Sequence, residues 1–160
     1  MIKFTGLLLI FICFSSGGCL FVKREKERIE AEEGMLYLIR NIRQNIAFFR
    51  KPLDEIYKQF SYPALERGKF LTIMREEGLQ TAYLSEKECF GYDSFTEARF
   101  ITFAENIGKL PLEEQLRSCD MLSEVLEEKL KDAKTNFPNK KKLYQALGIS
   151  LGLAFVILFV

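Results

Sequence analysis

The sequence contains no histidine and no tryptophan. Without histidine, Ser-His and Cys-His nucleophilic pairs are excluded, as are most metal sites with nitrogen ligands. The glycines stand singly or in apolar segments, so no glycine-rich phosphate loop is present. Paired carboxylates do occur, but they lie in charge-rich stretches typical of solvated helix faces: Glu32-Glu33, Glu76-Glu77, Glu113-Glu114 and Glu127-Glu128. We therefore predict no catalytic residue, no cofactor-binding residue and no metal ligand.

Cysteine is also scarce, with four in the chain. Cys13 and Cys19 lie near the start, whereas Cys89 and Cys119 stand far apart in the middle. No C-x-x-C spacing occurs, so neither a zinc knuckle nor a redox pair is indicated. Free thiols fit a reducing cytoplasm. A membrane-tethered enzyme that uses Cys89 or Cys119 is an alternative hypothesis, although buried structural cysteine is the commoner fate of such residues.

Excess charge of either sign is missing from the middle of the chain. Of 23 basic and 22 acidic residues, only Lys3 lies outside residues 23–142, so this segment is neutral. A neutral domain argues against nucleic acid as a partner, because phosphate binding needs a concentrated basic surface. The basic residues cluster instead at its two ends, at 23–28 and at 140–142. There they either attract anionic lipid head groups or only fix membrane topology.

Two apolar segments flank this neutral middle, from Phe4 to Val22 and from Leu143 to Val160. As helices they are each about 28 Å long, close to the ~30 Å hydrocarbon core of a bilayer. We predict two transmembrane helices, residues 1–22 and 143–160, and a domain of residues 23–142 between them. Basic residues concentrate on the inner side of both segments, which places the middle domain in the cytoplasm by the positive-inside rule.

A cleaved lipoprotein signal is the alternative interpretation of the first segment. Ser16-Gly17-Gly18-Cys19 loosely resembles a lipoprotein cleavage site, and Cys19 would carry the lipid. Lipoprotein cleavage sites typically have a large aliphatic side chain three residues before the cysteine. This chain has Ser16 at that position, which argues against cleavage. The apolar run also continues beyond Cys19 into the basic cluster, which is a stop-transfer pattern. A lipid-anchored extracytoplasmic protein is therefore a further alternative function.

The middle domain has helical periodicity and no long run of period two, which predicts an all-α helical bundle. Apolar residues from Ile29 to Phe49 advance by three or four and predict one buried face of a first helix. Pro52 and Pro63 each open a helix, Ser94-Phe95-Thr96-Glu97 predicts a capping box, and Gly108 predicts a stop. The expected helices are 23–50, which continues the first apolar segment as one long helix, then 52–60, 63–78, 94–108 and 112–135. A helix followed by a loop is expected over 79–93, and an interruption at 136–139.

Small residues in the apolar segments predict helix association. Gly148 and Gly152 form a G-x-x-x-G pattern, and the first segment has a small-residue patch from Ser15 to Gly18. The two long helices of the middle domain are expected to pair antiparallel, with their apolar stripes buried against each other. Any apolar surplus would be a surface for partners, including a second copy of the chain.

The whole chain resembles the stage III sporulation protein AB family of endospore-forming bacteria. The resemblance is strongest at residues 46–56, around Pro52-Leu53, and at Lys142 to Gly148 followed by Gly152-Leu153 and Ile157-Leu158. Weaker agreement occurs at Phe103, Gly108, Gln115, Leu122 and Leu126. The chain departs from the family at Phe48-Phe49-Arg50, where the family often has Tyr-Gly, and at Leu110-Pro111, where it often has Ser-Asp.

The resemblance implies a function that no single residue reveals. Family members belong to a multi-protein channel complex between mother cell and forespore, and they are similar to the F-domain platform proteins of type II secretion. This implies a non-enzymatic platform in the mother-cell membrane that docks a cytoplasmic motor ATPase and other channel subunits. Pro52, Leu53, Gly148 and Gly152 are the residues for which we predict packing or interaction roles.

Overall fold

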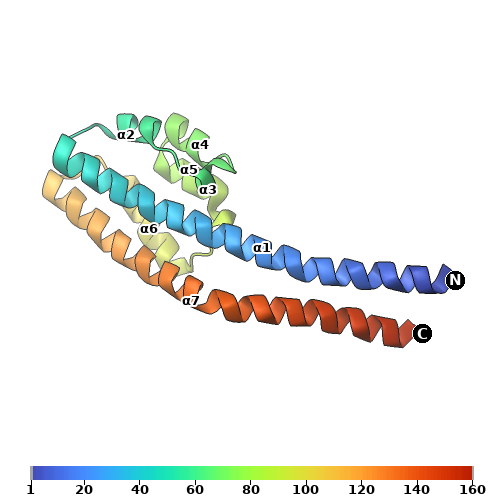
Figure 1. Cartoon of the computed structure of the whole chain (residues 1–160). Helices are drawn as coiled ribbons and strands as arrows, with labels where there is room; N and C mark the ends of the chain where they lie inside the picture. Colours follow the sequence, from blue (N-terminus) through green and yellow to red (C-terminus); the bar gives the residue numbers. More distant parts are fainter. Residues whose placement is uncertain (1, 160) are drawn as a thin grey trace. The chain divides into compact units, whose positions relative to one another are not determined.

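The computed structural model describes the backbone of residues 2–159 and the side chains of residues 17–154 and 157. Every regular element in this part of the chain is helical, which confirms the all-α prediction (Figure 1). The elements in order are α1 (Ile2–Gln44), a π-helical turn η1 (Asn45–Phe49), α2 (Leu53–Gln59), α3 (Pro63–Glu66), α4 (Phe70–Glu77), α5 (Leu79–Glu86), a 3-10 turn η2 (Lys87–Cys89), α6 (Ser94–Asn106) and α7 (Leu112–Phe159).

The chain divides into two compact units. One is the bundle of residues 28–132, which holds the C-terminal part of α1, the start of α7 and all the short helices. The other, here called the helical pair, combines residues 2–27 of α1 with residues 133–159 of α7. The predicted boundaries at 22/23 and 142/143 refer to a bilayer rather than to packing, and they stay predictions.

The bundle is held together by apolar side chains that α1 and α7 contribute on facing sides. Met35, Leu38 and Ile42 of α1 are fully buried, as are Cys119 and Leu126 of α7. Two ion pairs cross between the helices at their surface: Arg40 to Glu127, at 2.6 Å, and a two-pronged contact from Arg43 to Asp120. These pairs fix α1 and α7 as antiparallel neighbours, as expected.

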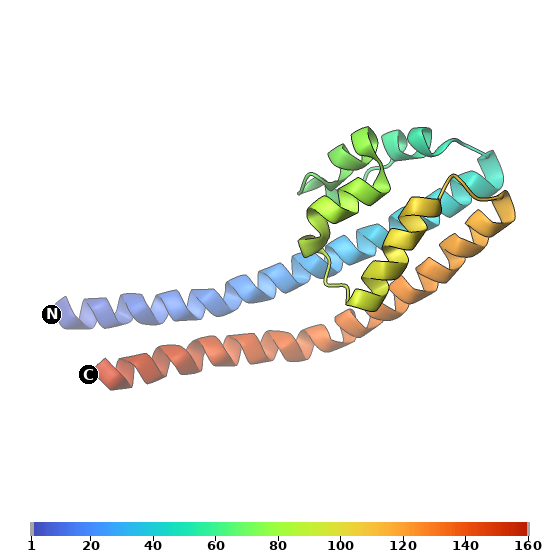
Figure 2. The same ribbon diagram turned by 180° about the vertical axis from the view of Figure 1, so that it is seen from behind.

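The short helices cover this core. Figures 1 and 2 show α6 beside the first half of α7, with α2 to α5 packed along α1. Phe100 of α6 and Tyr83 of α5 are buried, with ring centroids 4.3 Å apart. Asp93 caps α6 by accepting a hydrogen bond from the Thr96 amide, and it also pairs with Lys129 of α7 at 2.7 Å. The cap therefore fixes both the start of α6 and its attachment to α7.

The helical pair is packed through small residues and one aromatic contact. Gly18 of α1 lies so close to Tyr144 of α7 that an added Cβ would be 2.7 Å from the Tyr144 carbonyl oxygen. Phe21 stacks on Tyr144, with ring centroids 5.8 Å apart, and Glu25 accepts a 2.7 Å hydrogen bond from Lys140. Glycine at a helix interface allows two helices to approach this closely.

Membrane insertion itself stays a prediction. Among the residues whose side chains are described, no helix has a stretch long and apolar enough to cross a bilayer. The side chains of most of the first predicted transmembrane segment, residues 4–16, and of residues 155, 156 and 158–160 in the second lie outside the described residues.

Four local predictions are wrong in detail. The expected helix over 63–78 is two helices, α3 and α4, because the chain bends at Gly68, a poor helix former. The cap of α6 is Asp93 rather than Ser94. The expected interruption at 136–139 is absent, since α7 continues through Pro138. Phe49, placed on the buried face, is 68% exposed, because the π-helical turn rotates the end of the helix away from the 3.6-residue period.

Candidate docking groove

One concave surface of the bundle is a groove that follows the end of α1, here called the Pro52 groove. It has a volume of about 630 Å³ and is formed by η1, the connection at residues 50–52, the start of α2, the turn between α6 and α7, and the start of α7. Its lining residues are Ile46, Arg50, Lys51, Pro52, Leu53, Asp54, Gly108, Leu112 and Gln115.

The groove results from the backbone conformation that follows α1. After the π-helical turn, Arg50 takes a left-handed backbone conformation with φ 49° and donates its amide hydrogen to the Asn45 carbonyl. Pro52, with φ −65° and ψ 148°, then starts α2. Proline is well suited to this place because its fixed φ suits a helix start and it needs no amide partner there.

The floor of the groove depends on a close contact between two turns. Gly108 has φ 84°, and a Cβ at this position would lie 2.7 Å from Cδ1 of Leu53. Only glycine both adopts this backbone conformation readily and leaves room for Leu53. Gln115 supports the same turn, because its Nε2 donates a 2.6 Å hydrogen bond to the Leu110 carbonyl. The turns at residues 50–53 and 108–112 are thus built against each other.

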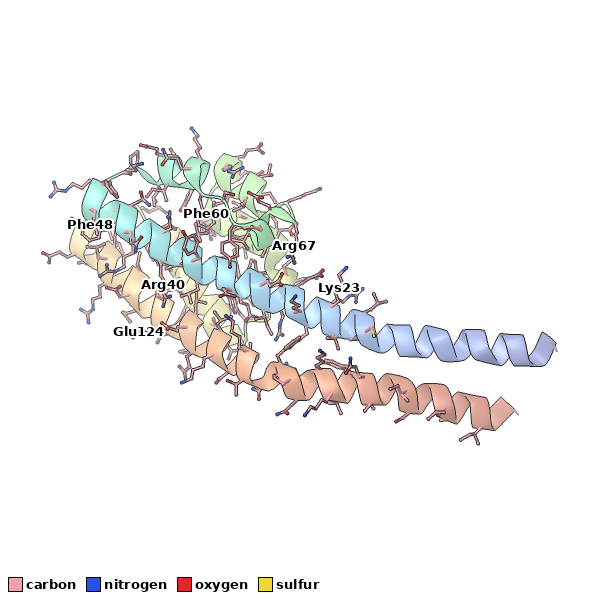
Figure 3. All side chains as sticks on the ribbon, in the orientation of Figure 1. Lys23, Arg40, Phe48, Phe60, Arg67 and Glu124 are labelled. Carbon is pink, nitrogen blue, oxygen red and sulfur yellow. The ribbon has the colours of Figure 1, made fainter. Side chains whose placement is uncertain are left out.

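Next to the groove in sequence, η1 exposes two aromatic side chains that do not themselves line it. Lys51, which does line it, has its Nζ 6.0 Å from the centroid of the Phe49 ring. Phe48 is 76% exposed and Phe49 is 68% exposed, although both belong to the helical turn η1 (Figure 3 labels Phe48). Lys51 is tied to α2 by a 2.9 Å hydrogen bond to Gln59. The Arg50 side chain, in contrast, has no hydrogen-bond or ion-pair partner within the described part of the chain. Adjacent exposed phenyl rings and a free guanidinium are typical of an interaction surface.

Two separate stretches of family resemblance contribute residues to this groove. Ile46 and Lys51 to Asp54 come from the strongest stretch, while Gly108 and Gln115 come from the weaker one, which is distant in sequence. Arg50, which also lines the groove, is one of the positions at which the chain departs from the family. Of the predicted interaction residues, Pro52 and Leu53 therefore lie together here. Sequence reasoning missed Leu112, and it missed the exposure of Phe49; the departure from a 3.6-residue period at 45–49 has no signal in the residue pattern.

Gly148 and Gly152 lie in the helical pair and not in the bundle. Both are buried, although their neighbours Leu147, Ile149 and Leu151 are exposed. They continue the face of α7 that carries Tyr144, because positions four apart lie on one side of a helix. The G-x-x-x-G face of α7 is thus the covered face of this helix.

A second, smaller groove of about 470 Å³ runs between α6 and α7. Phe103 and Leu122, its two residues of family resemblance, are buried core residues at 3% and 4% exposure. Its exposed ring, Phe95, is already covered by the Arg99 guanidinium, 4.7 Å from the ring centroid. We therefore consider this groove a weaker candidate for partner binding than the Pro52 groove.

The two thiols of the bundle have environments that disfavour nucleophilic chemistry. Cys119 is completely buried, and burial raises the pKa of its thiol to about 12. Cys89 is exposed, yet burial of the sulfur and its hydrogen bond to Glu86 raise its pKa as well. A reactive cysteine needs a lowered pKa, so these surroundings give no support to the alternative of a thiol enzyme. No cluster that could hold a metal ion occurs among the described residues.

Comparison with known proteins gives the family. The model of a family described as stage III sporulation protein AB matches residues 3–160. The chain belongs to the stage III sporulation protein AB family. No curated protein and no solved structure gave a match. Family membership makes this a protein of sporulation, and it confirms the resemblance seen in the residues around the Pro52 groove and at the end of α7.

Proposed function

We propose that this member of the stage III sporulation protein AB family is a non-enzymatic membrane platform of the mother cell–forespore channel complex, and that its Pro52 groove docks a cytoplasmic motor ATPase. The bundle faces the mother-cell cytoplasm, and both ends of the chain lie in the mother-cell membrane around the forespore. Other channel subunits, and further copies of the chain, are the remaining partners. The observation that carries the proposal is that family residues from two distant stretches line one groove, next in sequence to two exposed phenyl rings.

The register of the helical pair supports the membrane part of this proposal. Phe21 lies opposite Tyr144, and Glu25 lies opposite Lys140. Both helices rise by the same distance per residue, so in an antiparallel pair Val22 is level with Leu143. The last charged residue before each apolar segment is therefore at the same height on both helices. If both apolar segments cross one flat bilayer, their charged ends must lie at the same height, as they do here. Tyr144 lies one residue inside this level, and tyrosine is enriched at membrane interfaces.

The charge and shape of the Pro52 groove support the docking part. Phe48 and Phe49 keep large apolar surfaces in water, and the free Arg50 guanidinium beside them can receive a carboxylate of a partner. An apolar side chain of the partner would enter the groove over Leu53. Aromatic residues and arginine are the side chains that most often dominate binding energy at protein interfaces.

Site-specific crosslinking in sporulating cells tests this assignment. A photoreactive phenylalanine analogue replaces Phe48 in one strain and Phe95, 58% exposed on α6, in a matched strain. We expect position 48 to crosslink to the motor ATPase and position 95 to give much less of that product. The double variant Phe48→Ala and Phe49→Ala should weaken ATPase binding by at least ~30-fold, because a single aromatic hot spot buried in the interface contributes about 2 kcal/mol or more.

The same experiment can contradict the proposal. Equal ATPase crosslinking from positions 48 and 95, or unchanged binding by the double variant, would remove the Pro52 groove as the docking site. A circular dichroism spectrum of the double variant checks that the bundle remains folded; both side chains are already exposed, so little stability should be lost.

A further inference from the structure

The two basic clusters of the sequence form one band on the helical pair, here called the basic collar: Lys23, Arg24, Lys26, Lys140, Lys141 and Lys142. The contact of Glu25 with Lys140 sets the register, which brings Arg24 level with Lys141 and Lys23 level with Lys142. Clusters that are more than 100 positions apart in the chain thus lie at one height, directly below the apolar segments.

The acidic residues within this band are already engaged. Glu25, with its side chain 12% exposed, holds Lys140 at 2.7 Å, and Glu27 lies 3.9 Å from Lys23. Arg24, Lys141 and Lys142 are exposed and have no hydrogen-bond or ion-pair partner within the described part of the chain. Six basic against two acidic residues leave the band a charge of +4. Its unpaired cations are therefore available to an external anion.

From this arrangement we propose that the basic collar binds the phosphates of anionic phospholipids. A role in topology alone needs only the presence of basic residues in the sequence. A role in topology alone would not require the neighbouring glutamates to form ion pairs within the protein. It would also not require basic residues from two distant segments to lie at the same level. The inference rests on the proposed membrane location, since the collar reaches lipid head groups only where a bilayer surface crosses at Val22 and Leu143.

The chemistry favours a lipid phosphate over a protein carboxylate. Exposed hydrophobic residues continue directly from the collar on both helices, with Leu20 and Phe21 on α1 and Leu143 and Leu147 on α7. A phospholipid, with an anionic head group and apolar tails, matches a basic band that adjoins an exposed hydrophobic surface. Each lysine or arginine near an anionic membrane surface contributes about a fivefold gain in binding, so three free cations amount to roughly 100-fold.

Binding of defined lipids to the full-length protein tests the collar. The protein is purified in neutral detergent, short-chain phosphatidylglycerol or phosphatidylcholine is added, and bound lipids are counted by native mass spectrometry. The test variant carries Arg24→Gln, Lys141→Gln and Lys142→Gln. The control variant carries Lys58→Gln, Lys69→Gln and Lys109→Gln, which removes the same charge from exposed positions of the bundle.

We expect the wild type and the control variant to retain phosphatidylglycerol in preference to phosphatidylcholine, with a preference that weakens as salt rises. The test variant should lose this preference by on the order of 100-fold. Equal retention of both lipids by the wild type, or an unchanged preference in the test variant, would overturn the collar proposal.

A second measurement separates this proposal from the membrane location on which it rests. Wild type and test variant are reconstituted into phosphatidylcholine vesicles and extracted with sodium carbonate. Retention of both proteins supports membrane anchoring, and a lipid preference lost only in the test variant then supports the collar. Release of the wild type by carbonate would instead overturn the proposed membrane location. Thermal unfolding of the test variant should match the wild type, because the three substituted side chains have no partners to lose.

Discussion

At the scale of single residues, Arg50 is the one strained position of the Pro52 groove. Its φ of 49° is the only positive φ of a non-glycine residue in the described backbone. A left-handed conformation costs an ordinary L-residue roughly 1–2 kcal/mol, whereas glycine adopts it readily. The family often has glycine in this segment, which this chain lacks. Strain retained at an exposed, unpaired cation is consistent with a role of that side chain in binding.

Replacing this residue separates stability from docking. Arg50→Gly should raise the free energy of unfolding by about 0.5–1 kcal/mol, because glycine relieves the strain but adds entropy to the unfolded chain. Urea unfolding of the full-length protein in detergent measures it. Lys69→Gly, at a position with a negative φ of −94°, should instead leave stability unchanged or lower it. If Arg50→Gly is less stable than the wild type, the left-handed turn is not a source of strain.

At the scale of elements, the start of α6 depends on one carboxylate with two partners. Asp93 accepts from the Thr96 amide and pairs with Lys129 of α7. The hydrogen bond from Lys129 lowers the pKa of Asp93 well below its usual range, and the bond from Thr96 adds to this. Because the folded pKa is below the unfolded value near 4, the stabilising effect is complete at neutral pH. It is lost as the pH falls below about 4.

Asn at this position keeps the cap but removes the charge. Asp93→Asn should therefore lower stability at pH 7, and its difference from the wild type should shrink progressively as the pH falls below about 4 toward the lowered folded pKa, so the loss of stability on acidification becomes shallower. Thermal melts between pH 2.5 and 7 measure this slope. Glu124→Gln, at an exposed site on α7 (Figure 3), removes one charge without a paired partner and should keep the wild-type slope. An equally steep slope in Asp93→Asn would contradict the assignment.

At the scale of the whole molecule, glycine governs how the two ends of the chain pack. Gly18 approaches the backbone of α7 at Tyr144, and Gly148 and Gly152 are buried on the face that continues from Tyr144. Burial of residues without side chains means that something lies directly on the helix backbone. In lipid, such close packing replaces the hydrophobic effect as the source of helix association.

Enlarging these two glycines should disturb assembly without preventing insertion. We expect Gly148→Leu with Gly152→Leu to lower recovery of the channel complex severalfold, because two leucines force the helix surfaces apart. Co-purification from sporulating cells measures recovery, and carbonate extraction measures insertion. Ser150→Leu with Ala154→Leu enlarges exposed positions of the same helix and should have little effect. Equal recovery of both double variants would argue against a packing role for the glycines.

Much of the fold could be predicted because its signals are local. Pro52 starts a helix, Gly108 ends one with φ 84°, and the apolar stripe of α1 is buried from Ile29 to Ile46, as helical periodicity requires. Predictions that depend on neighbours fared worse. Pro138 stays inside α7, although proline removes one helical hydrogen bond. The helical turns of α7 that follow Pro138 contact α1 through Lys140 and Tyr144. Such contacts between distant residues cannot be predicted from a local sequence pattern.

The sequence by itself determined the all-helical class, the neutral middle between two apolar segments and the family, because composition and period are properties of the chain. Only the tertiary structure decided which distant residues meet: the turn at Pro52 with the turn at Gly108, and the cluster at residues 23–26 with the one at 140–142. The reason is physical. Local propensities act over a few residues, whereas the register between antiparallel helices is set by the side chains packed between them.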